Sequence, residues 1–275
     1  MLRKLFVRTF WTVYDHLGLL LLASLGWTAL SWPWWGGVLL LARALRPPLS
    51  ELTLLALIPV TALNPASLGL AALARELVRT GEATAGLFWT GLRRHLFRSL
   101  WLMAFGALVA LILGSSWAVY SAERLPLVGR WGNRIAAGLT VWVVLFALLA
   151  GSYWSPLAAD LSGRRIGLKT VLYRSALLTL DNPGFTLGVA LLCWASWAFW
   201  AATGLGLFVL AAGWSAVLQR HARDLLGEKY EVVETLRQEG RPVSRAAVRA
   251  ALQERWRQEP QRSWRELIRP WDARS

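Results

Sequence analysis

The sequence predicts an all-α protein: a polytopic bundle of about six transmembrane helices, with cytoplasmic amphipathic helices and a helical C-terminal tail. Of the 275 residues, 56% are hydrophobic and only 17% are charged, and the apolar residues gather in runs long enough to cross a bilayer. The single cysteine excludes a disulfide scaffold. The 30 Lys and Arg residues outnumber the 16 Asp and Glu residues and flank the apolar runs, which is typical of membrane topology rather than of nucleic-acid binding.

The apolar runs place a transmembrane domain at residues 1–219 and a basic cytoplasmic tail at 220–275. A span needs about 20 apolar residues, and five runs meet or approach that length. The run 185–217 is too long for one untilted span, and the glycines in 203–206 favour a tight hairpin, so six spans are preferred to five. The six predicted spans are about 17–32, 52–74, 100–120, 135–157, 185–202 and 206–219.

The first span could be mistaken for a signal peptide. We expect it to stay in the protein as a membrane helix, because no clear cleavage site follows it. An apolar stretch that reaches Leu45 follows this span, with Pro33 between them.

The positions of the basic residues predict the orientation. With six spans and a cytoplasmic N-terminus, 25 of the 30 Lys and Arg residues lie on the cytoplasmic side. Both termini are therefore expected in the cytoplasm, whereas a five-span topology would place the basic tail outside. The five basic residues expected outside are Arg43, Arg46, Arg124, Arg130 and Arg134.

Two cytoplasmic loops show helical periodicity, from Thr84 to Arg98 and from Ile166 to Leu180. Each places apolar residues on one face and Thr and Arg on another, which predicts helices at the cytoplasmic interface. Both contain Thr-x-Leu-x-Arg, 80 residues apart, which fits either an internal duplication or chance similarity.

Two prolines interrupt the second predicted span. Pro59 and Pro65 each remove a backbone donor, and Thr61 and Asn64 are placed to satisfy the freed backbone groups. Two interpretations remain open: a kinked structural helix, or a broken helix that lines a binding cavity.

The sequence carries no pattern for catalysis or metal binding. Its three histidines, at positions 16, 95 and 221, lie near predicted membrane interfaces and have no second His or Cys at ligand spacing. No phosphate-binding glycine loop, carboxylate pair or nucleophile–base arrangement is visible, so we expect no enzyme, cofactor or metal; a catalytic cluster among Asp15, His16, His95 and Asp160 is the distant alternative.

The centres of the six predicted spans lack ionisable residues, which argues against ion-coupled transport but not against a passive path. Asp160 is expected at a span end, where water or lipid headgroups solvate it.

Eighteen tryptophans are an unusual number for this length. Eight of them lie near predicted span ends, as interfacial aromatic belts do: Trp11, Trp32, Trp34, Trp35, Trp89, Trp101, Trp131 and Trp154. Trp194, Trp197 and Trp200 recur every three residues and indicate a packing stripe. The alternative to a belt at the outer surface is a saccharide platform formed by Trp32, Trp34 and Trp35.

The segment 59–65, Pro-Val-Thr-Ala-Leu-Asn-Pro, resembles the Pro-Val-x-Thr-x-Gly-Pro stretch of the YesL-like bacterial membrane protein family. The apolar-to-basic segment 71–79, the Gly81-Glu82 turn and the aromatic-rich segment 88–100 follow in the family's order. Here the threonine comes one position early, and Asn64 stands where the family usually has glycine. The resemblance implies an auxiliary membrane component of a bacterial carbohydrate-uptake system, and it supplies no catalytic residues.

The tail contains two amphipathic segments. Ser244 could cap a helix that runs to Gln258, with Val248, Leu252 and Trp256 on one side. A second apolar stripe follows Pro260, and basic residues frame it; its residues are Arg262, Trp264, Arg265, Leu267, Ile268, Arg269 and Trp271.

Three roles remain open for this second stripe: packing on the protein's own loops, lying on anionic lipid, or docking in a partner's groove. Two functions follow for the whole protein. The first is a scaffold that docks an ATPase or permease subunit of an ABC-type uptake system in the lipid bilayer, with no role in nucleic-acid binding. The second is a passive permease for a small neutral solute such as a sugar.

Overall fold

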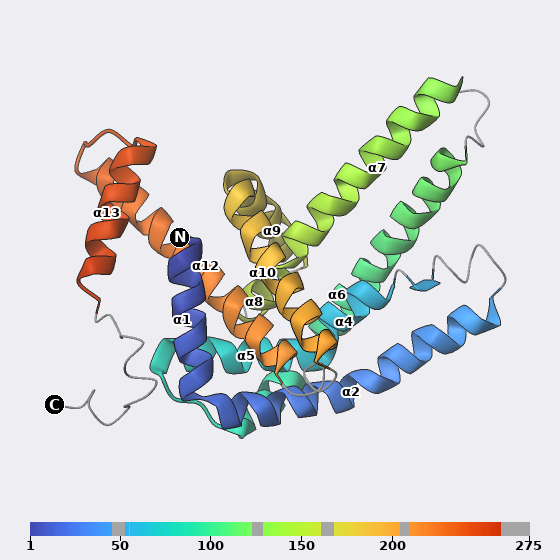
Figure 1. The fold of residues 1–275 in the computed structure, drawn as a ribbon, viewed down its shortest axis with the longest axis horizontal. Coiled ribbons are helices and arrows are strands. Elements are labelled where there is room, and N and C mark those ends of the chain that lie inside the picture. Colours follow the sequence, from blue (N-terminus) through green and yellow to red (C-terminus); the bar gives the residue numbers. More distant parts are fainter. Residues whose placement is uncertain (46–52, 55, 123–128, 161–167, 204–209, 260–275) are drawn as a thin grey trace. The chain divides into compact units, whose positions relative to one another are not determined.

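The computed structural model describes residues 1–45, 53–54, 56–122, 129–160, 168–203 and 210–259 (Figure 1). Within these ranges the chain is helical with short connections and contains no strand, so the all-α class is confirmed. The described helices are α1 (Leu2–Asp15), α2 (Leu17–Ala44), α4 (Leu57–Leu63), α5 (Pro65–Thr80), α6 (Ala85–Ser121), α7 (Gly129–Gly151), α8 (Trp154–Asp160), α9 (Leu168–Asp181), α10 (Pro183–Ala202), α12 (Ala211–Gln238) and α13 (Arg245–Arg257).

Four helical segments in the described part of the chain are long and apolar enough to cross a membrane. They are Leu17–Ala44, Ala85–Ser121, Gly129–Asp160 and Pro183–Trp200. This supports a membrane protein, but with fewer candidate spans than the six expected from the sequence.

The two remaining predicted spans differ from long apolar helices for separate reasons. The second, 52–74, is divided at Asn64 into α4 and α5, and part of it lies outside the described residues. The sixth, 206–219, begins in residues that are not described and does not end at 219, because α12 runs on into the charged tail as far as Gln238.

Two helix boundaries correct the sequence analysis, and a third agrees with it. Pro33 lies inside α2, so the first span and the apolar stretch after it form one helix. The predicted interfacial helix 84–98 and the third span are also continuous, as α6, because no proline interrupts 85–121. The second loop helix, α9, is by contrast separated from α10 at Asn182, directly before Pro183.

The core of the membrane bundle forms around α5, which packs against α2, α6 and α8. Its buried apolar side chains include Leu70 and Leu73, beside Phe88 of α6. A Cβ at Gly91 of α6 would lie 2.6 Å from the Cβ of Ala72, so only glycine permits this close approach of α5 and α6. Farther along, α6 and α7 lie side by side (Figure 1, green).

The chain divides into two compact units, Met1–Arg223 and Asp224–Ser275. In the second unit, α13 packs on the C-terminal part of α12, and the Ser244 side chain caps α13 by accepting a bond from the Ala247 amide at 3.1 Å. Trp256 Nε1 donates to Glu228 at 2.8 Å. The capped helix predicted from Ser244 is therefore confirmed, and its inner face consists of Val248, Leu252 and Trp256.

Candidate functional site

The candidate site starts at the break between α4 and α5. Asn64 has an extended backbone (φ −62°, ψ 164°), and its fully buried side chain caps α5 by accepting from the Ser67 amide at 3.0 Å. Its Nδ2 donates to Ser31 Oγ at 2.8 Å and to the Thr61 carbonyl at 3.3 Å. Pro65 occupies the first position of α5, where the missing amide costs no helical hydrogen bond. The second predicted span is thus a broken helix, and the Asn64 side chain forms hydrogen bonds with backbone groups at the break.

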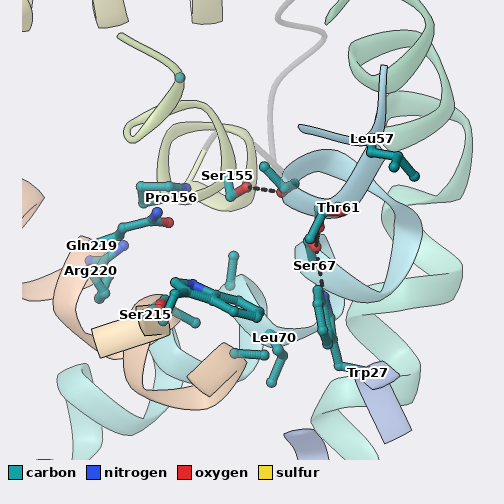
Figure 2. A pocket seen from close by; sticks show the side chains of 16 residues that line it. Trp27, Leu57, Thr61, Ser67, Leu70, Ser155, Pro156, Ser215, Gln219 and Arg220 are labelled. Atoms are coloured by element: carbon teal, nitrogen blue, oxygen red, sulfur yellow. Dashed lines mark hydrogen bonds between the residues drawn. The ribbon is translucent and has the colours of Figure 1, made fainter. Parts of the chain in front are cut away.

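A cavity of about 370 Å³, the first cavity, lies beside this break (Figure 2). The indoles of Trp27 and Trp197 form part of its wall. Its polar lining consists mostly of uncharged groups, and in Figure 2 Thr61 and Ser67 lie on the opposite side from Ser215, Gln219 and Arg220. Aromatic faces with a few polar groups are typical of small-molecule sites.

Most hydroxyl groups of the first cavity have protein partners. Thr61 Oγ1 accepts from Trp35 Nε1 at 3.0 Å, and Ser67 Oγ accepts from Trp27 Nε1 at 2.8 Å. Ser155 donates to the Ala62 carbonyl at 3.3 Å (Figure 2).

Ser215 is the exception. Its side chain is 7% exposed, and its Oγ has no hydrogen-bond partner among the described residues. A buried hydroxyl without a partner costs about 1–3 kcal/mol, so this position is suited to a bound polar molecule.

One edge of the first cavity carries a charged cluster. Asp160, at the end of α8, has a 12% exposed side chain and forms ion pairs with three arginines. Arg220 contacts Oδ1, Arg223 Nε lies 2.7 Å from Oδ2, and Arg75 Nε lies 3.4 Å from Oδ1. The expectation that water or lipid headgroups solvate Asp160 is therefore incomplete, because residues from α5 and α12 surround it.

The C-terminal carbonyls of α8 are also occupied. Arg75 Nη1 donates to the Ala159 carbonyl and Arg98 Nη1 to the Ala158 carbonyl, both at 3.1 Å. Positive charges at a helix C-terminus interact favourably with the helix dipole and so stabilise the helix. Helices α5, α6 and α12 are thus joined electrostatically through the end of α8.

The sequence-predicted site residues are distributed unevenly. Thr61 lines the first cavity, whereas Asn64 and Pro65 are buried in the break. Of the tryptophans proposed for a saccharide platform, Trp32 is 56% exposed and Trp34 is half-buried. Trp35 turns toward the break, where it packs on Trp27 with ring centroids 5.7 Å apart. The residues of the second tail stripe, Arg262, Trp264, Arg265, Leu267, Ile268, Arg269 and Trp271, lie outside the described residues.

Sequence reasoning missed the part of the cavity wall that α8 and α12 contribute. Ser155 and Ser215 lie within small-residue and apolar segments, and nothing local marks them. Trp197 belongs to the predicted packing stripe, and its three-residue spacing with Trp194 and Trp200 is the signal that one face of α10 points inward.

The described part of the chain contains no group of three or more His, Cys, Asp or Glu side chains that could hold a metal ion.

His221 is buried, and its Nε2 lies 2.9 Å from Thr12 Oγ1. Burial lowers the pKa of His221 to about 3, and the positive charges of Arg8 and Arg220 act in the same direction.

Stability should therefore fall on acidification. Below about pH 6.5 the unfolded chain protonates His221 while the folded protein keeps it neutral, down to about pH 3. We expect the melting temperature of the His221→Gln variant to fall less than that of the wild type between pH 7 and pH 5. Thermal unfolding followed by tryptophan fluorescence measures this, and equal losses in the two proteins would contradict it.

The chain matches no protein-family model, no curated protein and no solved structure. The resemblance to the YesL-like family therefore stays a prediction.

Proposed function

We propose that the chain is a non-enzymatic multi-pass protein of the bacterial cytoplasmic membrane that serves as an auxiliary component of an ABC-type carbohydrate-uptake system. In this proposal it docks cytoplasmic partners through its inside loops and its tail. The link to carbohydrate uptake rests on the resemblance of segment 59–65 to the YesL-like family.

The observation that carries the docking role is the course of α12. Its first half lies in the membrane unit, where Val217, Leu218 and Ala222 are fully buried and Arg220 is bound to Asp160. Its second half forms the base on which α13 packs in the second unit. The charged helical pair of the second unit thus follows directly in sequence from helical residues that are anchored in the bundle.

The proposal keeps six spans with both termini in the cytoplasm. Helices α4 and α5 together make the second span, and the start of α12 makes the sixth. Broken helices occur in membranes where protein groups satisfy the freed backbone, and Asn64 supplies such bonds here.

A second candidate function, passive passage of a small neutral solute such as a sugar, is favoured by the first cavity. Its uncharged hydroxyl groups and two indoles are chemically suited to such a solute. Solute flux into proteoliposomes that contain this protein alone would favour passage over the auxiliary role.

Co-purification tests the docking role. We expect an ATP-binding or permease subunit to co-purify from native membranes with the full chain, and to be lost when residues 262–275 are removed. Within the full chain, Trp264→Ala and Trp271→Ala should each weaken capture by about 2 kcal/mol, roughly thirtyfold, because buried tryptophans dominate such interfaces.

The matched control is Trp131→Ala, which truncates a 76% exposed tryptophan on the side expected to face outward and should leave capture unchanged. If no transport subunit co-purifies with any form, the docking role is wrong.

A further inference from the structure

A second cavity, of about 440 Å³, lies next to the first and has a different chemistry. Helices α6 and α7 supply most of its wall, with α4, α8, α10 and α12 closing the rest. Its lining is mainly aliphatic and includes Val109, Leu113, Val141, Val144 and Leu148. Both cavities lie in the size range of small-molecule sites, about 300–1,000 Å³.

The two cavities meet at shared residues. Ala62, Gly151, Trp197, Ser215 and Gln219 line both of them. The hydroxyl-lined space beside the helix break therefore borders directly on the aliphatic space between α6 and α7, and the change from polar to apolar occurs at this junction.

Two features of the first cavity, the polar one, define the chemical group that it would hold. Ser215 Oγ, on a side chain more than nine-tenths buried, has no protein partner at the junction. The charged lining residue, Arg220, has a 10% exposed side chain that is already paired with Asp160. An uncharged group with hydroxyls can bond to Ser215 without adding a buried charge.

We infer that the two cavities together bind one amphiphile, with an uncharged hydroxyl-bearing head in the first cavity and a single hydrocarbon chain in the second. A free sugar would leave the aliphatic cavity unused, and a plain hydrocarbon would leave Ser215 without a partner. A lipid-like ligand satisfies both, and it can enter from the bilayer that the exposed faces of α6 and α7 are expected to contact. This site goes beyond the auxiliary role and does not depend on the tail.

The experiment uses the full chain in phosphatidylcholine nanodiscs, with thermal unfolding as the measurement. The probes are monoolein and dodecyl glucoside, each with a neutral hydroxylated head and one hydrocarbon chain. The controls, called half-ligands, each carry only one of these parts: glycerol and glucose are heads without a chain, and methyl oleate is a chain without a hydroxylated head. We expect at least one probe to raise the melting temperature by about 5 °C at saturation, and the half-ligands to change it little.

Two glycines of α7 provide a matched pair of variants. A Cβ at Gly151, at the junction, would meet nothing within 4 Å, and the same holds for Gly138, which lines neither cavity. Gly151→Leu should place its side chain in the junction and abolish the ligand-induced shift. Gly138→Leu should bind the probe as the wild type does.

Ser215→Ala provides a test that does not depend on filling space. It removes an unpartnered hydroxyl, so the unliganded protein should be at least as stable as the wild type, while probe affinity should fall roughly tenfold. Ser116→Ala is its control, because that hydroxyl bonds to a carbonyl of its own helix at 2.8 Å and lines neither cavity.

Each other outcome overturns the inference. Equal stabilisation by glucose or glycerol would indicate a free neutral solute, and equal stabilisation by methyl oleate would indicate a plain hydrocarbon site. Failure of both probes, or unchanged affinity in Ser215→Ala, would show that no such amphiphile binds here. If Gly151→Leu does not fold, Ser215→Ala still decides.

Discussion

Asp160→Asn is expected to lower the free energy of unfolding by about 3–5 kcal/mol, because removing one partner of a buried ion pair leaves the other charge uncompensated. Arg220 is the main source of this loss, since its side chain is only 10% exposed. Arg75 and Arg223 are about one-third exposed and should contribute less, because water screens them. A fall of roughly 10 °C in the melting temperature would correspond to this loss.

Two further variants separate this effect from a general loss of surface charge. Glu76→Gln breaks an exposed pair with Arg79 and should leave the melting temperature nearly unchanged. Adding Arg220→Gln to Asp160→Asn should restore part of the lost stability, because it removes the stranded charge. If Asp160→Asn behaves like Glu76→Gln, the cluster does not hold α8 to α12.

Asn64→Ala is expected to cost about 2–4 kcal/mol. The substitution removes the cap of α5, worth about 1 kcal/mol, and takes hydrogen bonds from the buried Ser31 hydroxyl and the Thr61 carbonyl. The melting temperature of the purified protein measures the loss.

The control for Asn64→Ala is Thr84→Ala at the N-cap of α6, where the native side chain makes no capping bond. This control should change the melting temperature little. Equal effects of the two substitutions would mean that Asn64 does not stabilise the break.

Features that depend on neighbouring residues could be predicted from the sequence. The proline pair with Asn64 predicted an interruption of the second span, and Ser244 with its apolar spacing predicted α13. Pro33 shows the limit of such reasoning: one lost hydrogen bond does not end a helix when the residues on both sides remain helical.

Features that depend on residues far apart in sequence could not be predicted. Asp160 is bound by Arg75, 85 positions earlier, and by Arg220, 60 positions later. The first cavity likewise combines Thr61, Ser155 and Ser215 from three separate elements. Periodicity and spacing report which face of a helix is apolar, but not which distant helix that face meets.

The cytoplasmic position of the C-terminal unit is the central claim, and labelling of single cysteines with a membrane-impermeant maleimide tests it directly. The buried Cys193 is the chain's only cysteine, so Cys193→Ala gives a cysteine-free background. Val243, between α12 and α13, and Ser121, at the end of α6, are both exposed and suited to replacement by cysteine. We predict that the Ser121→Cys variant is labelled in intact cells and the Val243→Cys variant only after lysis. Labelling of the Val243→Cys variant in intact cells would contradict the proposed orientation and docking role.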